Sequence, residues 1–252
     1  YSLVWTISNI SGSSSDTVII SFSPANPNYG TLFDTRDGNT YNTILIGNQR
    51  WMAENLKYLP EVSPPDSSSY SSTTYHVYDY YGNDLQAAKA TSNYQTYGVL
   101  YNWNAAMAGD VSSNSVPSGV QGICPTGWHL PSDEEWKILE GEVDSQYGYP
   151  NPIWNTLYWR GTDVGGNLKE TGITHWYQPN YGATNSSGFT ALPGGYADGA
   201  SFLYLIYNGC FWSSAENGSN LAWYRELIYN GPAVQRLSKG KYYGFSVRCI
   251  KD

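Results

Sequence analysis

The residues with the greatest potential for covalent or acid–base chemistry are the cysteines and histidines: Cys124, Cys210, Cys249, His76, His129 and His175. None of the cysteines forms a C-x-x-C pair, which argues against zinc binding and thioredoxin-type exchange. The histidines are far apart in sequence and show no H-E-x-x-H metal spacing. In an oxidising compartment, three cysteines predict one disulfide and one remaining thiol.

A run of three acids, residues 133–135, could supply the paired carboxylates of a glycoside hydrolase. Ser132 precedes the run, and Ser132 with Glu135 has the S-x-x-E spacing of a helix capping box. Acids in the first turn also interact favourably with the helix dipole. We therefore assign these acids to the start of a helix. Because no G-x-S-x-G nucleophile motif is present either, the sequence predicts a protein that is not an enzyme.

The C-terminal segment, residues 191–252, interleaves framework-like words with irregular positions. The words include 192–195 (LPGG), 211–214 (FWSS) and 244–249 (GFSVRC). The apolar and aromatic residues between them follow neither the period of a strand nor that of a helix. A cluster of exposed Tyr, Ile and Leu usually marks a binding surface. The candidate binding residues are Tyr204, Ile206, Tyr207, Tyr224, Ile228, Tyr229, Leu237, Tyr242 and Tyr243.

The composition favours an exported, loop-rich protein. Charged residues make up 13% of the 252-residue chain, whereas Tyr, Trp and Gly number 24, 10 and 26. Tyrosine-rich surfaces of this kind are typical of extracellular binding proteins. The net charge of −8 argues against nucleic-acid partners and against anionic membrane surfaces. No apolar run approaches the ~20 residues of a membrane span, so we expect no membrane insertion. The composition favours an extracellular or cell-surface location.

Alternating patterns predict two strands near the start of the chain, at residues 3–7 and 17–22. Residues 1–30 therefore form a β extension, or the end of a preceding domain. Residues 24–28, rich in proline and asparagine, are expected to link it to one domain over residues 31–252. Whether the extension is a separate domain is left open.

Within that domain, Asp37-Gly38 and Gly47-Asn48 predict tight hairpin turns. We expect irregular chain over residues 60–95 and long loops over 147–190. A long structureless run in a compact domain is usually functional.

Two helices and a final strand are predicted. The apolar stripe that starts at Leu100 indicates a helix over residues 97–108. A second helix begins after Ser132, and the last strand covers residues 244–250 with Phe245, Val247 and Cys249 on one face.

Five sequence words in order resemble the Fibrobacter succinogenes major paralogous domain, a family of exported bacterial proteins. The resemblance covers about residues 33–252. The words are 34–41 (DTRDGNTY), 46–56 (IGNQRWMAENL), 97–103 (YGVLYNW), 124–131 (CPTGWHLP) and 244–249 (GFSVRC).

Residues 130–136 (LPSDEEW) and 244–248 (GFSVR) are also similar to words of the sulfatase-modifying family. That resemblance implies an α+β, C-type-lectin-like fold with two helices, small and mostly antiparallel sheets, and long loops. The last strand would return beside the first. Within this plan Cys124, at the helix entry, is expected to pair with Cys249 in the last strand, which leaves Cys210 alone.

Residues 191–252 further resemble the C-terminal segments that bacterial and phage diversity-generating retroelements rewrite. In such segments, adenine-rich asparagine codons become Tyr, Ile, Leu, Ser, Gly, Pro, Ala or Cys. Glu226 and Gln235 do not fit that route and are expected to be framework. The resemblance implies a non-catalytic adhesin or receptor-binding module, carried by a bacterium or a phage, whose partner is a protein or a glycan.

Two other interpretations stay open. Gln178-Pro179-Asn180 has the form of the sugar-specificity tripeptide of calcium-dependent lectins, but their Trp-Asn-Asp partner is replaced by Trp212-Ser213-Ser214, which lacks a carboxylate. The chain could also be a structural module of a larger surface protein. No cofactor is expected, and a structural calcium ion is the alternative.

Overall fold

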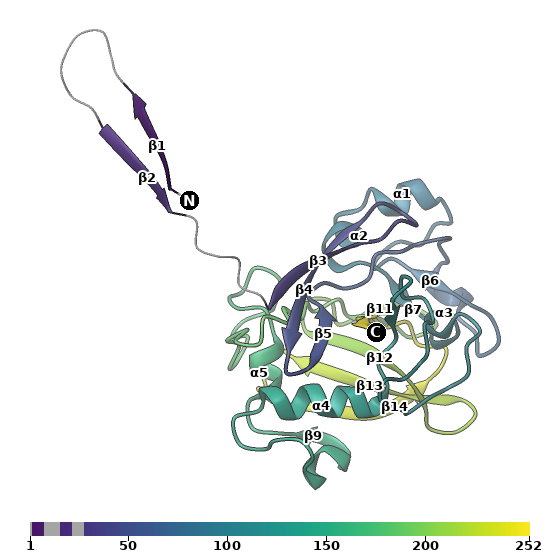
Figure 1. The fold of residues 1–252 in the computed structure, drawn as a ribbon. Coiled ribbons are helices and arrows are strands. Elements are labelled where there is room, and N and C mark those ends of the chain that lie inside the picture. The colour runs from purple at the N-terminus through teal and green to yellow at the C-terminus, as the bar shows by residue number, and fades with distance from the viewer. Residues whose placement is uncertain (1, 8–15, 22–27) are drawn as a thin grey trace.

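The protein was analysed as a computed structural model, which describes residues 2–7, 16–21 and 28–252. The first two ranges are strands β1 (Ser2–Ile7) and β2 (Asp16–Ser21), which pair antiparallel. Both predicted N-terminal strands are thereby confirmed, and Figure 1 shows their hairpin apart from the other strands. Phe22 and most of the predicted linker at 24–28 lie outside the described residues.

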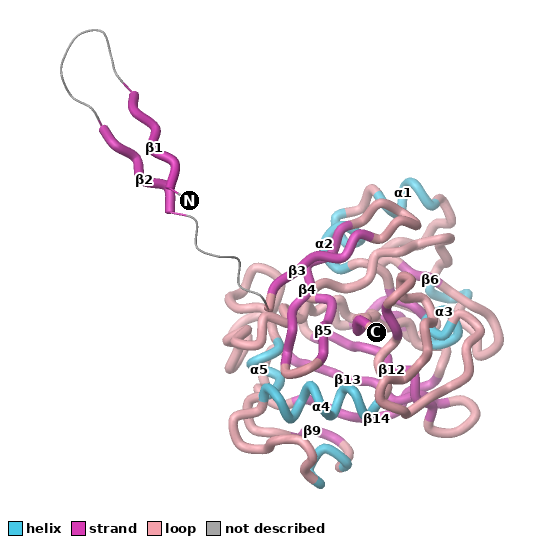
Figure 2. Tube along the Cα trace, in the orientation of Figure 1, coloured by secondary structure: helices cyan, strands magenta, loops and turns pink. Residues whose placement is uncertain are grey.

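The rest of the described chain is mixed α+β, with small antiparallel sheets, few helices and much loop (Figure 2). One sheet has the strand order β3-β4-β5-β15-β8. Its strands are β3 (Tyr29–Phe33), β4 (Thr40–Ile46), β5 (Gln49–Met52), β8 (Trp128–His129) and β15 (Ile250–Lys251). Since β3 starts at Tyr29, two residues assigned to the N-terminal extension belong to this sheet.

Both predicted hairpin turns are confirmed. Gly38 lies between β3 and β4 with φ of 78°, and Gly47 lies between β4 and β5 with φ of 55°. Glycine adopts these left-handed conformations without the steric penalty of a side chain.

The second large sheet is built almost entirely from the C-terminal segment, in the order β12-β13-β14-β9. All its neighbours are antiparallel. Its strands are β9 (Tyr158–Arg160), β12 (Asn208–Glu216), β13 (Leu221–Ile228) and β14 (Val234–Gly240). The segment therefore forms strands although its irregular positions show no strand period.

Helix α4 (Asp133–Val143) packs against this sheet (Figure 1). Its predicted capping box is confirmed: Ser132 Oγ accepts from the Glu135 N–H at 3.1 Å, and Glu135 Oε2 accepts from the Ser132 N–H at 2.9 Å. The Trp136 indole donates to the Trp212 carbonyl at 3.2 Å, which ties the helix to β12.

The predicted helix over 97–108 is wrong in its first half. Helix α2 (Ser92–Tyr97) ends at Gly98, whose φ is 75°, and Leu100–Tyr101 forms strand β7, which pairs with β6 (Tyr75–His76). Only α3 (Trp103–Met107) is helical, because the Asn102 side chain caps a new helix start by accepting from the Ala105 N–H.

Short elements interrupt both stretches that were predicted to be irregular. The two helices implied by the resemblance are also too few, since the described residues hold five α-helices, of which α4 is the longest. The remaining elements are α1 (Leu85–Lys89), α5 (Val164–Leu168), 3-10 helices η1 (Pro65–Ser67) and η2 (Pro152–Asn155), β10 (Tyr196–Ala197) and β11 (Phe202–Leu203). No helix among the described residues is long and apolar enough to span a bilayer.

The predicted last strand is mostly not a strand, because the chain changes partners along it. Gly244 bridges Ala197, Phe245 bridges Tyr101, and Ser246 bridges Phe211. Ser246 and Arg248 are as buried as Phe245, Val247 and Cys249, so both faces of the segment are covered. The final strand β15 joins the same sheet as β3, but it pairs with β5 and β8.

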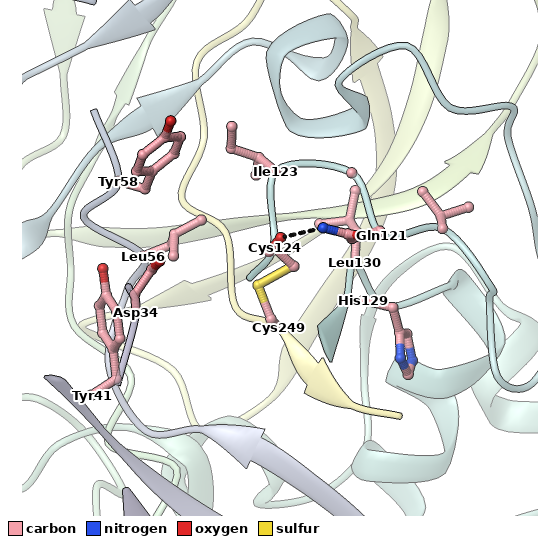
Figure 3. The surroundings of a disulfide bond; sticks show 12 residues. Asp34, Tyr41, Leu56, Tyr58, Gln121, Ile123, Cys124, His129, Leu130 and Cys249 are labelled. Carbon is pink, nitrogen blue, oxygen red and sulfur yellow. Dashed lines mark hydrogen bonds between the residues drawn. A yellow bond between two sulfur atoms is a disulfide. The ribbon is translucent and has the colours of Figure 1, made fainter. Parts of the chain in front are cut away.

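The disulfide between Cys124 and Cys249 is confirmed, with a Cα–Cα distance of 5.9 Å. It links the turn before β8 to the segment before β15, 125 residues apart in sequence, and Figure 3 shows it beside Leu56 and Leu130. Cys210 is free and buried, in strand β12.

Candidate functional site

The register of β12, β13 and β14 sorts the C-terminal segment onto two faces of its sheet. Residues that pair across neighbouring strands point to the same side. Cys210, Glu226 and Gln235 form one such row, and Trp212, Tyr224 and Leu237 form the next. We call this side the site face; it comprises Asn208, Cys210, Trp212, Tyr224, Glu226, Ile228, Gln235, Leu237 and Lys239.

The opposite face is fixed to α4 by buried ion pairs. Arg225 Nη1 lies 2.7 Å from Asp133 Oδ1, and Arg236 Nη2 lies 2.7 Å from Asp133 Oδ2. Arg225 Nε and Arg160 Nη2 both contact the Glu140 carboxylate. Burial alone would raise the pKa of Asp133, but the guanidinium groups of Arg225 and Arg236 hold it well below its usual value. This side of the sheet is therefore framework.

A cavity of about 140 Å³ opens on the site face. Its walls carry the rings of Tyr196, Tyr224, Tyr243 and Phe245, and its other lining residues are Cys210, Glu226, Gln235, Leu237 and Lys239. The ring centroids of Tyr224 and Phe245 are 4.8 Å apart, and those of Tyr196 and Tyr243 are 5.8 Å apart. Distances in this range are typical of aromatic side chains in contact.

Glu226 places a carboxylate in this aromatic cavity. Asn208 Nδ2 donates to its Oε1, and the Tyr224 hydroxyl donates to its Oε2 at 3.2 Å. With its amide nitrogen toward Glu226, Gln235 donates to Oε2 at 2.7 Å and accepts from Trp159 Nε1 at 3.2 Å. Burial raises the pKa of Glu226, and the hydrogen bonds from Tyr224 and Asn208, together with the charge of Lys239, offset only part of the rise.

The structure brings three of the sequence-predicted residues to this cavity. Leu237 and Tyr243 line its wall, and both are partly exposed. Tyr224 is only 2% exposed, so its predicted role as an exposed contact is wrong. Its ring packs against Trp212 and Phe245, and it contributes to the cavity from inside.

Two further predicted tyrosines extend the site at the cavity rim. Tyr204 is 52% exposed, and its ring centroid lies 5.6 Å from that of Tyr196. Tyr242 lies between Tyr243 and Tyr70, with centroid distances of 4.8 and 4.9 Å. A row of tyrosine rings therefore continues from the cavity to the surface.

Tyr207 and Tyr229 belong to a second group, the tyrosine cluster, which also includes Tyr177. The three ring centroids are 4.8 to 5.4 Å apart. Tyr177 comes from the loop after α5, and its N–H donates to the Ile206 carbonyl at 2.8 Å. Ile228, the last residue of β13, is partly exposed. The predicted residues thus occupy two adjoining parts of one region.

Lys169 holds the loop of the tyrosine cluster against the end of β13. Its buried Nζ donates to the carbonyls of Tyr181, Ile228 and Gly231 at 2.9 to 3.0 Å. Burial lowers the pKa of Lys169 to about 8. This lysine positions the site without lining it.

Several residues of the site escaped the sequence analysis. Trp159, Tyr177, Tyr196 and Lys239 come from the predicted loop region or from between the framework words. For Trp159 and Tyr177, the one available signal was the density of aromatic residues in the long stretch 147–190. Glu226 and Gln235, expected to be framework, lie in the cavity itself.

The groups singled out for chemistry take structural positions. Burial raises the pKa of the Cys210 thiol well above its usual value, which suppresses the thiolate. His129 contacts Glu135 Oε1 and Asp252 Oδ1 at 2.8 and 2.7 Å. In the tripeptide 178–180, Asn180 is buried and its Nδ2 donates to two carbonyls of its own loop. Over the described ranges, no group of three or more His, Cys, Asp or Glu could hold a metal ion.

Fold and site together define an α+β domain whose C-terminal sheet turns one face to α4 and the other to an aromatic cavity. The chain matches the Fibrobacter succinogenes major domain over residues 44–251, and it belongs to that family. Comparison with curated proteins and with solved structures gives no match.

Proposed function

We propose that this protein is a non-catalytic ligand-binding protein, an adhesin or receptor-binding module exported to the cell surface or carried by a phage. One observation carries the proposal: irregular positions from separate stretches of the C-terminal segment converge on the site face and the tyrosine cluster. The opposite face of the same sheet is locked to α4 by Asp133, Arg225 and Arg236. A rigid scaffold that carries aromatic anchors gives affinity at a low ordering cost.

We further propose that the fold is C-type-lectin-like and that residues 191–252 are a diversified segment. The capped helix α4, the Cys124–Cys249 disulfide and the return of β15 to the first sheet support the fold assignment. The division between framework and irregular positions supports diversification. Cys210, Leu237 and Ile228 are irregular and lie on the site face, whereas Phe211 and Arg225 are framework and face α4; of the framework residues, Trp212 also lies on the site face, where it is fully buried.

The chemistry of the site supports binding. Tyrosine rings, one carboxylate and two amides can contact either a protein or a glycan, while the thiol of Cys210 is buried and protonated. The acidic net charge of −8 supports neither a nucleic acid nor an anionic membrane as the partner.

Deep sequencing of the coding region in its source population, with the flanking DNA, tests the proposal. We expect substitutions to concentrate at Tyr204, Tyr207, Leu237 and Tyr243 and to map to adenines in a nearby template copy. Arg225, which pairs with Asp133 and Glu140 beneath α4, should stay unchanged and serves as the internal control. Sparse changes spread evenly along the chain would instead favour a structural module of a larger surface protein.

A further inference from the structure

The cavity on the site face combines aromatic walls with a negative charge. Four aromatic residues, Tyr196, Tyr224, Tyr243 and Phe245, line it, and Glu226 supplies a carboxylate. Aromatic ring faces carry partial negative charge and attract cations within about 6 Å of the ring centroid. The aromatic walls and the carboxylate therefore both favour a positively charged ligand.

Protein donors already occupy most of the acceptor capacity of Glu226. A carboxylate has about four lone-pair sites, and Asn208, Tyr224 and Gln235 each donate to one. Few sites are left for the hydroxyl groups of a neutral ligand. The negative charge itself is not neutralised by these donors, and a partly buried charge is stabilised when an opposite charge lies beside it.

Lys239 shows that the cavity accommodates a cation. Its Nζ lies 5.2 Å from the centroid of the Tyr243 ring, at the wall of the cavity. Its charge also acts on the Glu226 carboxylate. Because Lys239 is partly exposed and its side chain is long and flexible, a ligand cation can displace it toward solvent.

We propose that this cavity binds a positively charged group of the ligand, an ammonium or guanidinium, between Glu226 and the tyrosine rings, in place of the Lys239 ammonium. The inference rests on the proposed function, since it names the chemistry of the ligand that the site face takes. Both a lysine or arginine side chain of a partner protein and a small quaternary ammonium compound carry such a group.

The test compares cationic probes with neutral probes of the same shape on the full chain. Choline is paired with 3,3-dimethyl-1-butanol, and N-acetyl-lysine methylamide with N-acetyl-norleucine methylamide. Binding is followed by NMR shifts of the Tyr243 and Tyr196 rings. We expect the cation of each pair to bind and the neutral compound not to bind. The affinities of the two cations are then compared: tighter binding of choline indicates a quaternary ammonium ligand, and tighter binding of the lysine derivative indicates a side chain of a partner protein.

Two substitutions should act in opposite directions. Glu226→Gln keeps the size of the side chain and removes its charge, so cation affinity should fall by roughly tenfold, because contacts with an ionised acceptor are about twice as strong as neutral ones. Lys239→Met removes the resident cation and should tighten the same binding several-fold. Glu61→Gln and Lys251→Met, which change exposed residues elsewhere, are the matched controls and should leave the affinity unchanged.

Equal binding of the neutral probes, or weaker cation binding in Lys239→Met, would overturn the inference. Thermal unfolding of Glu226→Gln shows whether that variant is folded, and Lys239→Met gives an independent result if it is not. The proposed function is judged separately, by the binding of the whole protein to target cells. If the cations fail to bind while tyrosine substitutions still abolish cell binding, only the cation inference fails; if cell binding is also unaffected, both fail.

Discussion

His129 illustrates how a residue that resembles a catalytic group can serve as a structural tie. Its ring bridges Glu135, the capping residue of α4, and Asp252 beside β15. Burial lowers the pKa of His129, but the hydrogen bonds and charges of Glu135 and Asp252 outweigh burial and leave it raised. The imidazole ring thereby connects the helix that carries the ion-pair network to the end of the chain.

This tie predicts a pH dependence of stability. Because the folded-state pKa of His129 is raised above 6.5, its contribution is complete below that value and is lost as pH rises through the folded-state pKa. The free energies of unfolding of the protein and of His129→Gln, measured in urea, should therefore converge as pH increases from about 6 upward. A stability difference that stays constant or grows with pH would contradict this role.

At the scale of elements, the sheet face beneath α4 determines how well the site is held. Asp133, Glu140, Arg160, Arg225 and Arg236 are all buried there and mutually paired. Such a network is sensitive to the loss of one member, because the charges that remain are left buried without a partner.

Arg225→Met is expected to lower the free energy of unfolding by about 3–5 kcal/mol, since Asp133 and Glu140 both lose a guanidinium partner. Lys57→Met, which breaks the more exposed 3.9 Å pair with Glu54, is the control and should cost less than about 1 kcal/mol. Chemical denaturation of both variants checks the prediction. Comparable small losses would show that the network does not hold the sheet to α4.

The same elements show what could be predicted from sequence. The start of α4 and the hairpin turns depend on residues a few positions apart, so local patterns were sufficient. The helix over 97–108 failed because Leu100–Tyr101 pairs with Tyr75–His76, a contact that no local pattern reveals. The family resemblance supplied the disulfide partner.

The strands of the C-terminal segment were missed for a different physical reason. Alternation of apolar and polar residues marks a strand only when one face is apolar and the other polar. In β13 the buried inner face carries Arg225, satisfied by ion pairs, while the site face carries the apolar Ile228 beside Glu226. Most of the residues predicted as a binding group nonetheless lie in one region of the structure, whereas Trp159 and Tyr177 join them only through tertiary contacts.

At the scale of the whole molecule, the ion-pair network and the proposed binding residues occupy different parts of the C-terminal sheet. The ion pairs lie between the sheet and α4, and Lys169 holds the loop of the tyrosine cluster at the end of β13. Under the proposed function, we expect the exposed and partly exposed tyrosines Tyr204, Tyr207 and Tyr243, unlike the buried Tyr224, to change in identity without loss of the fold.

The most direct measurement is the binding of the labelled full chain to a panel of cells, proteins and glycans, with and without the combined change Tyr204→Ser, Tyr207→Ser and Tyr229→Ser. Tyr29→Ser, an exposed tyrosine of the other large sheet, is the matched control. The account predicts saturable binding that the triple variant loses and Tyr29→Ser retains, with both variants folded. Equal binding by the triple variant and the unchanged protein would contradict the assignment of the cavity rim and the tyrosine cluster as the binding site.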